Sequence, residues 1–183
     1  MLAAILSFGP RPVRVARSLF GVLAFGAALA AHPAGAAATK TGLAAASVHP
    51  GVAQRVVDCI TAAASRHDLP AGIILAILRT EGGTLGETSQ NSNGTVDIGP
   101  MQINSRWLPQ LAKRLRVSES AALRRVRDEF CANIDAGAWI LRQAIDLAGG
   151  DFWKGVGFYH SQTPQLGHAY VKRVVGRMMA QAS

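Results

Sequence analysis

The sequence predicts a mainly helical domain with one loop-rich insertion, preceded by a leader segment. Three observations support this. Apolar residues recur at helical spacing through most of the chain after residue 50. Paired glycines at 82–83 and 149–150 stand where helices would stop. Between them, residues 82–99 are rich in Gly, Ser, Asn and Thr, which is typical of a turn-dense loop or a small β-ribbon.

The first 36 residues have the pattern of a secretory signal peptide. A basic stretch contains Arg11, Arg14 and Arg17, and an apolar run at 18–31 and small residues at 33–38 follow it. The apolar run is about 14 residues long, whereas a membrane span needs about 20. We therefore expect cleavage after Ala36, export to the periplasm, a flexible lead-in at 37–49 and one domain at 50–183.

Charge and size limit the classes of partner. Removing the leader leaves 16 Lys and Arg against 11 acidic residues, a net charge of +5. A basic exported protein meets anionic wall polymers or membrane surfaces more readily than nucleic acid, although Arg can also serve solubility alone. The chain lacks the interleaved basic and aromatic residues of nucleic-acid modules. We expect a monomer that binds no nucleic acid.

The helices are predicted in order from their apolar faces and their ends. Helical spacing of Val52, Val56, Ile60 and Ala63 predicts a helix that ends near residues 67–68. Pro70 suits the first turn of a second helix, which ends at 80–83. Its predicted core face is Ile73, Ile74, Ile77 and Leu78.

The second half of the chain predicts a hairpin and further helices. Asn93-Gly94 favours a hairpin turn, with a short strand at 95–98. Ser105, Ser118 and Asp151 are the expected caps of three helices. A long apolar stripe runs from Cys131 to Ala148. The core faces of the other helices are expected to be Trp107, Leu108, Leu111 and Leu115; Phe152, Trp153, Val156 and Tyr159; and Leu166, Tyr170, Val174 and Met178.

The chain has two cysteines, Cys59 and Cys131. Two cysteines in an exported protein most often form one disulfide. No His stands at ligand spacing to either, which argues against a metal site, and a catalytic thiol would leave the other cysteine unexplained. We expect a disulfide and no metal or cofactor.

Glu81 is the candidate catalytic residue. It ends a very apolar helix and precedes Gly82-Gly83. Burial and the negative end of the helix dipole both disfavour a carboxylate, so both raise its pKa, as a general acid requires. On local sequence alone, an exposed residue in the last turn is the commoner outcome.

Four motifs that occur in a fixed order favour the catalytic interpretation of Glu81 over an exposed residue. Glu81-Gly-Gly, Asp97-Ile-Gly-Pro-Met-Gln-Ile-Asn104, Cys131-Ala-Asn-Ile and Tyr159-His-Ser occur in succession. Together they resemble the soluble lytic transglycosylase family, whose domain has a lysozyme-like fold. The resemblance covers roughly residues 59–178 and is greatest to small exported members that accompany type III or type IV secretion, conjugation or pilus systems. Cys59 and Cys131 match a cysteine pair in those members.

The resemblance implies roles for individual residues. Glu81 would be the acid and base, Gln102 and Tyr159 would lie in the glycan groove, Met101 would pack beside the sugar, and Asn104 would order the loop. Helix-entry capping is the alternative for Gln102 and Asn104, and the better one for Asn104. Two departures stand out. Gly82 replaces a common Ser whose hydroxyl could position the carboxyl, and His160 interrupts a Tyr-Asn-Ala-Gly pattern, so it inherits no role.

The implied reaction cleaves the β-1,4 bond between N-acetylmuramic acid and N-acetylglucosamine in peptidoglycan, forming 1,6-anhydromuramyl ends. Most glycosidases need two carboxylates. Asp97 is the candidate partner, but beside Ile98-Gly99 it is better interpreted as a turn-stabilising residue. A transglycosylase needs only Glu81, with help from the substrate's N-acetyl group. The alternatives are a hydrolysing muramidase and an inactive wall-binding scaffold.

Overall fold

The computed structural model describes residues 50–180. The predicted signal peptide and the lead-in at 37–49 lie outside the described residues. Within this part of the chain no helix is both long and apolar enough to cross a membrane.

The helices are α1 Pro50–His67, α2 Ala71–Glu81, α3 Leu108–Leu115, α4 Glu119–Asp128, α5 Phe130–Leu147, α6 Phe152–His160 and α7 Pro164–Met179. The strands are β1 Thr88–Gln90, β2 Val96–Ile98 and β3 Ile103–Asn104, and a 3₁₀ helix spans Ser105–Trp107. The prediction of a mainly helical fold with a small β insertion is confirmed.

Helix ends follow the predicted signals with one exception. Ser118 accepts a hydrogen bond from the Ala121 N–H and Asp151 accepts one from the Lys154 N–H, so each caps its helix. The predicted Ser105 cap is wrong. Asn104 caps the 3₁₀ helix instead by accepting from the Arg106 N–H, and Ser105 Oγ accepts from the Val96 N–H in β2. The capping residue, Asn104 at the end of β3, therefore lies one position before the predicted Ser105.

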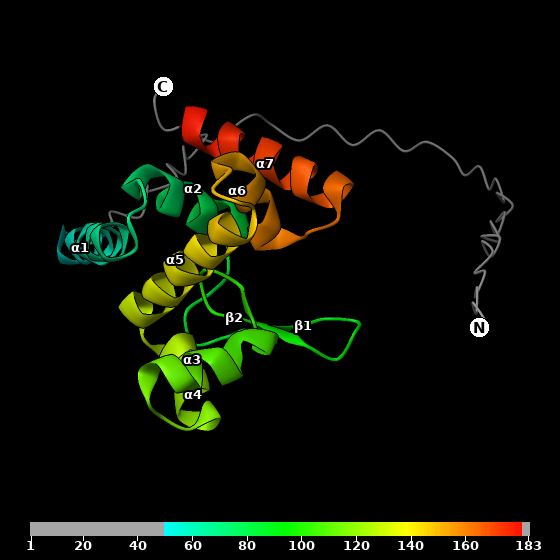
Figure 1. Ribbon diagram of the computed structural model, residues 1–183. Helices are drawn as coiled ribbons and strands as arrows, with labels where there is room; N and C mark the ends of the chain where they lie inside the picture. Colours follow the sequence, from blue (N-terminus) through cyan, green and yellow to red (C-terminus); the bar gives the residue numbers. More distant parts are fainter. Residues whose placement is uncertain (1–49, 181–183) are drawn as a thin grey trace, which may run out of the picture. The chain divides into compact units, whose positions relative to one another are not determined.

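Helix α5 runs through the centre of the described domain (Figure 1). It packs against α1, α4 and α6, and α7 packs against α2 and α6. Its buried face includes Ile134, Ala138, Leu141 and Ile145, as the apolar stripe predicts. The core therefore lies around α5, with the apolar face of α2 and residues of α7 completing it.

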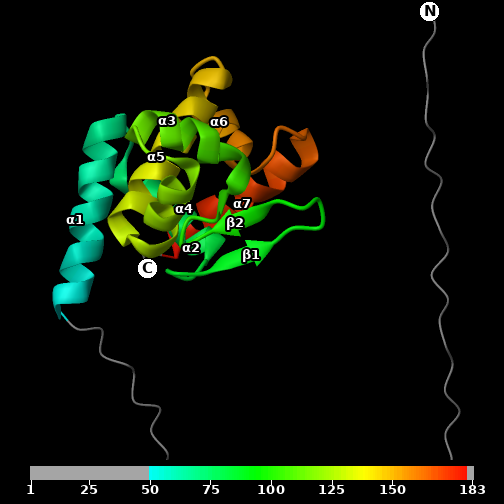
Figure 2. The same ribbon diagram turned by 90° about the horizontal axis from the view of Figure 1, so that it is seen from below.

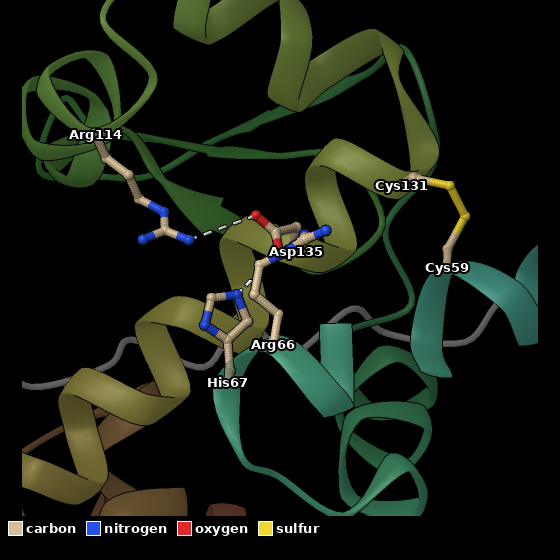
Figure 3. Close-up of polar contacts among 6 residues, drawn as sticks. All are labelled: Cys59, Arg66, His67, Arg114, Cys131 and Asp135. Carbon is tan, nitrogen blue, oxygen red and sulfur yellow. Dashed lines mark hydrogen bonds and ion pairs between the residues drawn. A yellow bond between two sulfur atoms is a disulfide. The ribbon is translucent and has the colours of Figure 1, made fainter. Parts of the chain in front are cut away.

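Two links fasten α1 to α5 (Figure 3). Cys59 and Cys131 form the predicted disulfide, with Cα atoms 5.0 Å apart. The second link is the carboxylate of Asp135 on α5. Its Oδ1 lies 2.5 Å from Arg66 Nη1 and 2.9 Å from His67 Nε2 at the end of α1. Its Oδ2 lies 3.8 Å from Arg114 Nη2 on α3. In the chain-entropy model, a disulfide closing a loop of 72 residues stabilises the fold by about 4 kcal/mol.

The insertion is a three-stranded antiparallel sheet in the order β1-β2-β3. Figure 2 shows the ribbon of β1 and β2 along one side of the helices. The Asn93 side chain accepts from the Thr95 N–H and hydroxyl and so stabilises the turn. The predicted turn role of Asp97 is wrong, because Asp97 lies inside β2 opposite Ser89.

Three residues assigned to core faces are exposed. Val52 is 57% exposed, Trp153 43% and Leu166 52%. All three lie in the first turns of their helices, where fewer neighbouring elements are packed against the chain.

Candidate active site

A groove of about 920 Å³ brings together residues that are far apart in the sequence. One part of its lining comes from the β-ribbon and the residues before α3, and another from the end of α6 and the start of α7. Glu81, Gln102, Asn104 and Tyr159 all line it, as do Asp97 and His160. Of the predicted groove residues, Met101 alone is absent from the lining.

Glu81 is the last residue of α2 and is partly buried in the groove. Burial raises the pKa of its carboxyl group, and the nearby charge of Asp97 raises it further. A hydrogen bond from Tyr170 and the charge of Arg173 act in the opposite direction but do not cancel burial. The carboxyl therefore keeps its proton to higher pH than an exposed Glu, as a general acid must.

Tyr170 positions the Glu81 carboxyl. A Ser hydroxyl could do this in many members of the family that the sequence resembles, but Gly82 replaces that Ser here. The Tyr170 hydroxyl donates to Glu81 Oε1 at 2.5 Å, although the tyrosine is on α7 and 89 residues away in sequence. The hydrogen bond occupies Oε1, so Oε2 is left to carry an acidic proton. Sequence reasoning identified Tyr170 only as a core residue, and its ring is indeed buried. A tyrosine on a fully buried helical position is the signal that could have found it, because a buried hydroxyl needs a partner.

The ring of Tyr170 contacts His160, which lines the groove, and Arg173, which does not. His160 stacks on it with ring centroids 4.8 Å apart and planes 4° apart, and the Arg173 guanidinium lies 5.3 Å from its centroid. His160, to which the resemblance gave no role, is exposed and belongs to the groove lining. Partial desolvation of the ring, together with the positive charge of Arg173, lowers the pKa of His160, so the ring stays neutral near neutral pH.

The two glycines after Glu81 serve different purposes. Gly82 adopts φ 62°, and its N–H bonds the Leu78 carbonyl, which ends α2 with a left-handed residue. Gly83 lies so close to the Gly99 carbonyl and the Gln102 side chain that a Cβ would clash with both. Gln102 itself has φ 48° and donates from Nε2 to the Gly99 carbonyl at 2.9 Å. The Glu-Gly-Gly motif thus lets the end of α2 meet the loop that carries Gln102.

Asn104 orders the insertion, as the resemblance implies, and also caps a helix, as the alternative held. Its Nδ2 donates to Thr95 Oγ1 at 3.0 Å and to Asp97 Oδ1 at 2.8 Å, while its Oδ1 caps the 3₁₀ helix. The carboxylate of Asp97 is thereby tied to β3 at the groove wall.

The expectation that Met101 packs beside a sugar needs correction, because its side chain is only 1% exposed. Gly137 on α5 leaves the space that this side chain fills. The backbone of Met101 is nevertheless part of the site, since its carbonyl accepts from the Tyr159 hydroxyl at 2.9 Å and its N–H donates to Asn133. Asn133 is fully buried and also donates to the carbonyls of Ile98 and Val126. Asn133, which the sequence showed only as part of a motif, anchors the loop before Gln102.

No group of three or more His, Cys, Asp or Glu within residues 50–180 is arranged to hold a metal ion. The groove lining contains the carboxyl groups of Glu81 and Asp97 together with amide, aromatic and hydroxyl groups, and Tyr170 donates a hydrogen bond to Glu81. In this helical domain, an apolar helix thus ends in a partly buried Glu that lines a groove with many polar groups.

Comparison with known proteins assigns this domain to a family. Residues 58–175 match the family model of the Transglycosylase SLT domain, which is well over half of the chain. The chain belongs to this family and has its lysozyme-like helical fold.

The chain is also similar to the invasion protein IagB of Salmonella typhimurium strain SL1344. The two are 30% identical over 107 residues, which make up 58% of this chain and 63% of IagB. The IagB proteins of S. typhimurium strain LT2 and of Salmonella typhi match at the same identity and coverage. The match therefore spans less than two thirds of the length of these relatives.

Proposed function

We propose that this protein is an exported peptidoglycan lytic transglycosylase with Glu81 as its single catalytic acid and base. One observation carries the proposal: Glu81 lies in a polar groove with a raised pKa and a tyrosine partner. Membership of the transglycosylase family supports peptidoglycan as the substrate. An inactive wall-binding scaffold would have no use for a carboxyl held in this way.

The residues suggest the following proton transfers. Glu81 donates the proton on Oε2 to the oxygen between N-acetylmuramic acid and N-acetylglucosamine, and the bond from C1 to that oxygen breaks. The resulting carboxylate, stabilised by Tyr170 and Arg173, takes the proton of the muramyl 6-hydroxyl as that oxygen bonds to C1. The substrate's own N-acetyl group stabilises the intermediate. In this proposal Gln102 and Tyr159, which both line the groove, contact the glycan.

A hydrolysing muramidase is the second candidate, because Asp97 lines the same groove as Glu81. Most hydrolysing glycosidases use a second carboxylate as nucleophile or base. Asp97 is held by Asn104 instead, and its charge helps to keep Glu81 protonated. We therefore assign Asp97 a supporting role.

Substitution of the two carboxylates separates these functions. Glu81→Gln keeps size and polarity but has no proton to donate, so activity on purified peptidoglycan should fall about 10²–10⁴-fold or more. Asp97→Asn is the matched control and should cost far less. Mass spectrometry of the wild-type digest should show anhydromuramyl ends and almost no reducing ends. Dominant reducing ends would indicate a muramidase, and a fully active Glu81→Gln protein would refute the assignment.

The cellular setting is a further part of the proposal. The predicted leader supports periplasmic action, and the similarity to proteins named for invasion supports local wall remodelling around a secretion, conjugation or pilus apparatus. Deleting the leader should abolish recovery of the protein in periplasmic extracts.

A further inference from the structure

A second pocket, of about 590 Å³, lies between α6 and α7. Gly157 and Gly167 face each other where the two helices meet, so that a Cβ on Gly157 would come within 3.4 Å of the Gly167 backbone. Because these positions carry no side chain, the two helices approach closely, and both glycines form part of the pocket lining. The walls that matter here are Trp153, Lys154 and Phe158 from α6, and His168, Val171 and Lys172 from α7.

The chemistry of this pocket is aliphatic and aromatic with a basic rim. Lys154 Nζ lies over the Phe158 ring, 5.5 Å from its centroid. Within the described residues neither Lys154 nor Lys172 forms an ion pair. The acid in the lining, Asp151, accepts from the Lys154 backbone N–H to cap α6. The pocket thus suits a ligand that has carboxylates and short aliphatic groups.

The pocket and the groove share part of their lining. Phe158, Ser161 and Gln162 line both. If a glycan occupies the groove, a group that projects from it at these shared residues would lie next to the pocket. In peptidoglycan such a group exists, since the lactyl ether of each muramic acid carries a short peptide with free carboxylates.

We propose that the pocket between α6 and α7 binds the stem peptide of the peptidoglycan strand, with carboxylates of the peptide facing Lys154 and Lys172. This inference rests on the proposed function, because it takes the groove to hold a muramyl glycan. The covalent link between sugar and peptide raises the effective concentration of the peptide at the pocket, so weak contacts are sufficient. A volume of about 590 Å³ suits a few residues of peptide. A stable protein partner would need a much larger surface.

The test measures binding, so that it does not depend on cleavage. Soluble glycan strands are prepared with stem peptides and, after amidase treatment, without them, and their affinity is measured for the full-length Glu81→Gln protein. Adding Lys154→Gln and Lys172→Gln should weaken binding of the stem-bearing strands about 2- to 30-fold. Binding of the stem-free strands should not change. Lys113→Gln with Arg124→Gln removes the same charge from exposed sites on α3 and α4 and is the matched control.

A second variant tests the wall without altering charge. Trp153 is 43% exposed, so Trp153→Ala should fold, and it should also weaken only the stem-bearing strands. Unchanged binding in both variants, or equal loss on both kinds of strand, would overturn the proposal. Stem-dependent binding by a protein whose wild type makes no anhydro ends would leave this pocket in place and refute the proposed activity instead.

Discussion

Glu81 is held by the hydroxyl of Tyr170, a residue of α7 that follows it by 89 positions in the sequence. Tyr170 is the residue that compensates for Gly82, which has no side chain to position the carboxyl. The hydrogen bond also matters electrostatically. A donated bond stabilises the carboxylate more than the acid, so Tyr170 holds the pKa of Glu81 below the level that burial alone would set.

Tyr170→Phe tests this role with little change in shape. The general acid must be protonated, so activity is lost as pH rises through the pKa of Glu81. Without the hydrogen bond that pKa rises further, and the alkaline limb of the pH–rate profile should move to higher pH. The maximal rate should fall about 10- to 100-fold, because the carboxylate formed on proton transfer loses its partner.

Tyr159→Phe is the control for the same measurement. Its hydroxyl donates to the Met101 carbonyl rather than to a carboxylate. This variant should leave the alkaline limb in place, whatever it does to the rate. An unshifted limb in Tyr170→Phe would show that the tyrosine does not tune Glu81.

At the scale of secondary structure, α5 organises the site from behind. Its first turns carry Cys131, which is bonded to α1, Asn133, which holds the loop before Gln102, and Asp135, which joins the end of α1 to α3 (Figure 3). Burial raises the pKa of Asp135, but hydrogen bonds from Arg66 and His67 and their charges outweigh burial, so its pKa is lowered overall.

Asp135→Asn should therefore destabilise the fold in a pH-dependent way. The depressed pKa means that Asp135 stabilises the folded state above the ordinary pKa of an Asp and loses this effect as pH falls through its folded pKa. Near pH 7 the variant should lose about 1–3 kcal/mol of unfolding free energy. Urea unfolding should show the difference shrinking in acid.

Asp146→Asn on the same helix is the control for that prediction. Its pair with Arg142 is at the surface, with the Asp146 side chain 59% exposed, so its loss should cost less than about 1 kcal/mol. Equal losses in both variants would mean that the contacts of Asp135 are no stronger than a surface pair.

At the scale of the whole molecule, the position of Glu81 in the groove lowers the stability of the folded protein as the carboxyl ionises. The raised pKa of Glu81 means that the folded protein holds this proton to higher pH than the unfolded chain does. Its contribution to stability therefore falls as pH rises from the unfolded pKa to the folded pKa, and is constant above both.

Glu81→Gln should consequently be more stable than the wild type at neutral pH while being inactive. A neutral amide avoids the burial of a charge but keeps an acceptor for Tyr170. Thermal unfolding should show a higher Tm for the variant at pH 7 and a smaller difference at pH 4. A variant that is less stable than the wild type at pH 7 would contradict the prediction that ionisation of Glu81 destabilises the fold.

The sequence by itself determined the helices, the disulfide pairing and the location of the candidate acid. Helix signals are local: apolar spacing, caps and paired glycines act within a few residues, so α1, α2 and α4–α7 follow from the pattern. Two lone cysteines leave one intramolecular pairing. The ordered motifs placed Glu81, Gln102 and Tyr159 together before any distance was known, and the groove contains all three.

Only the tertiary structure decided how these residues are used. The sequence pattern placed Tyr170 on a core face and the resemblance placed Met101 beside the sugar, yet Tyr170 reaches Glu81 with its hydroxyl and Met101 is buried against Gly137. The sequence predicts a turn role for Asp97 and a loop-ordering or capping role for Asn104, yet the two side chains bond each other across β2 and β3. The physical reason is that burial, hydrogen-bond partners and pKa depend on which distant segments pack together, and local spacing does not encode those neighbours.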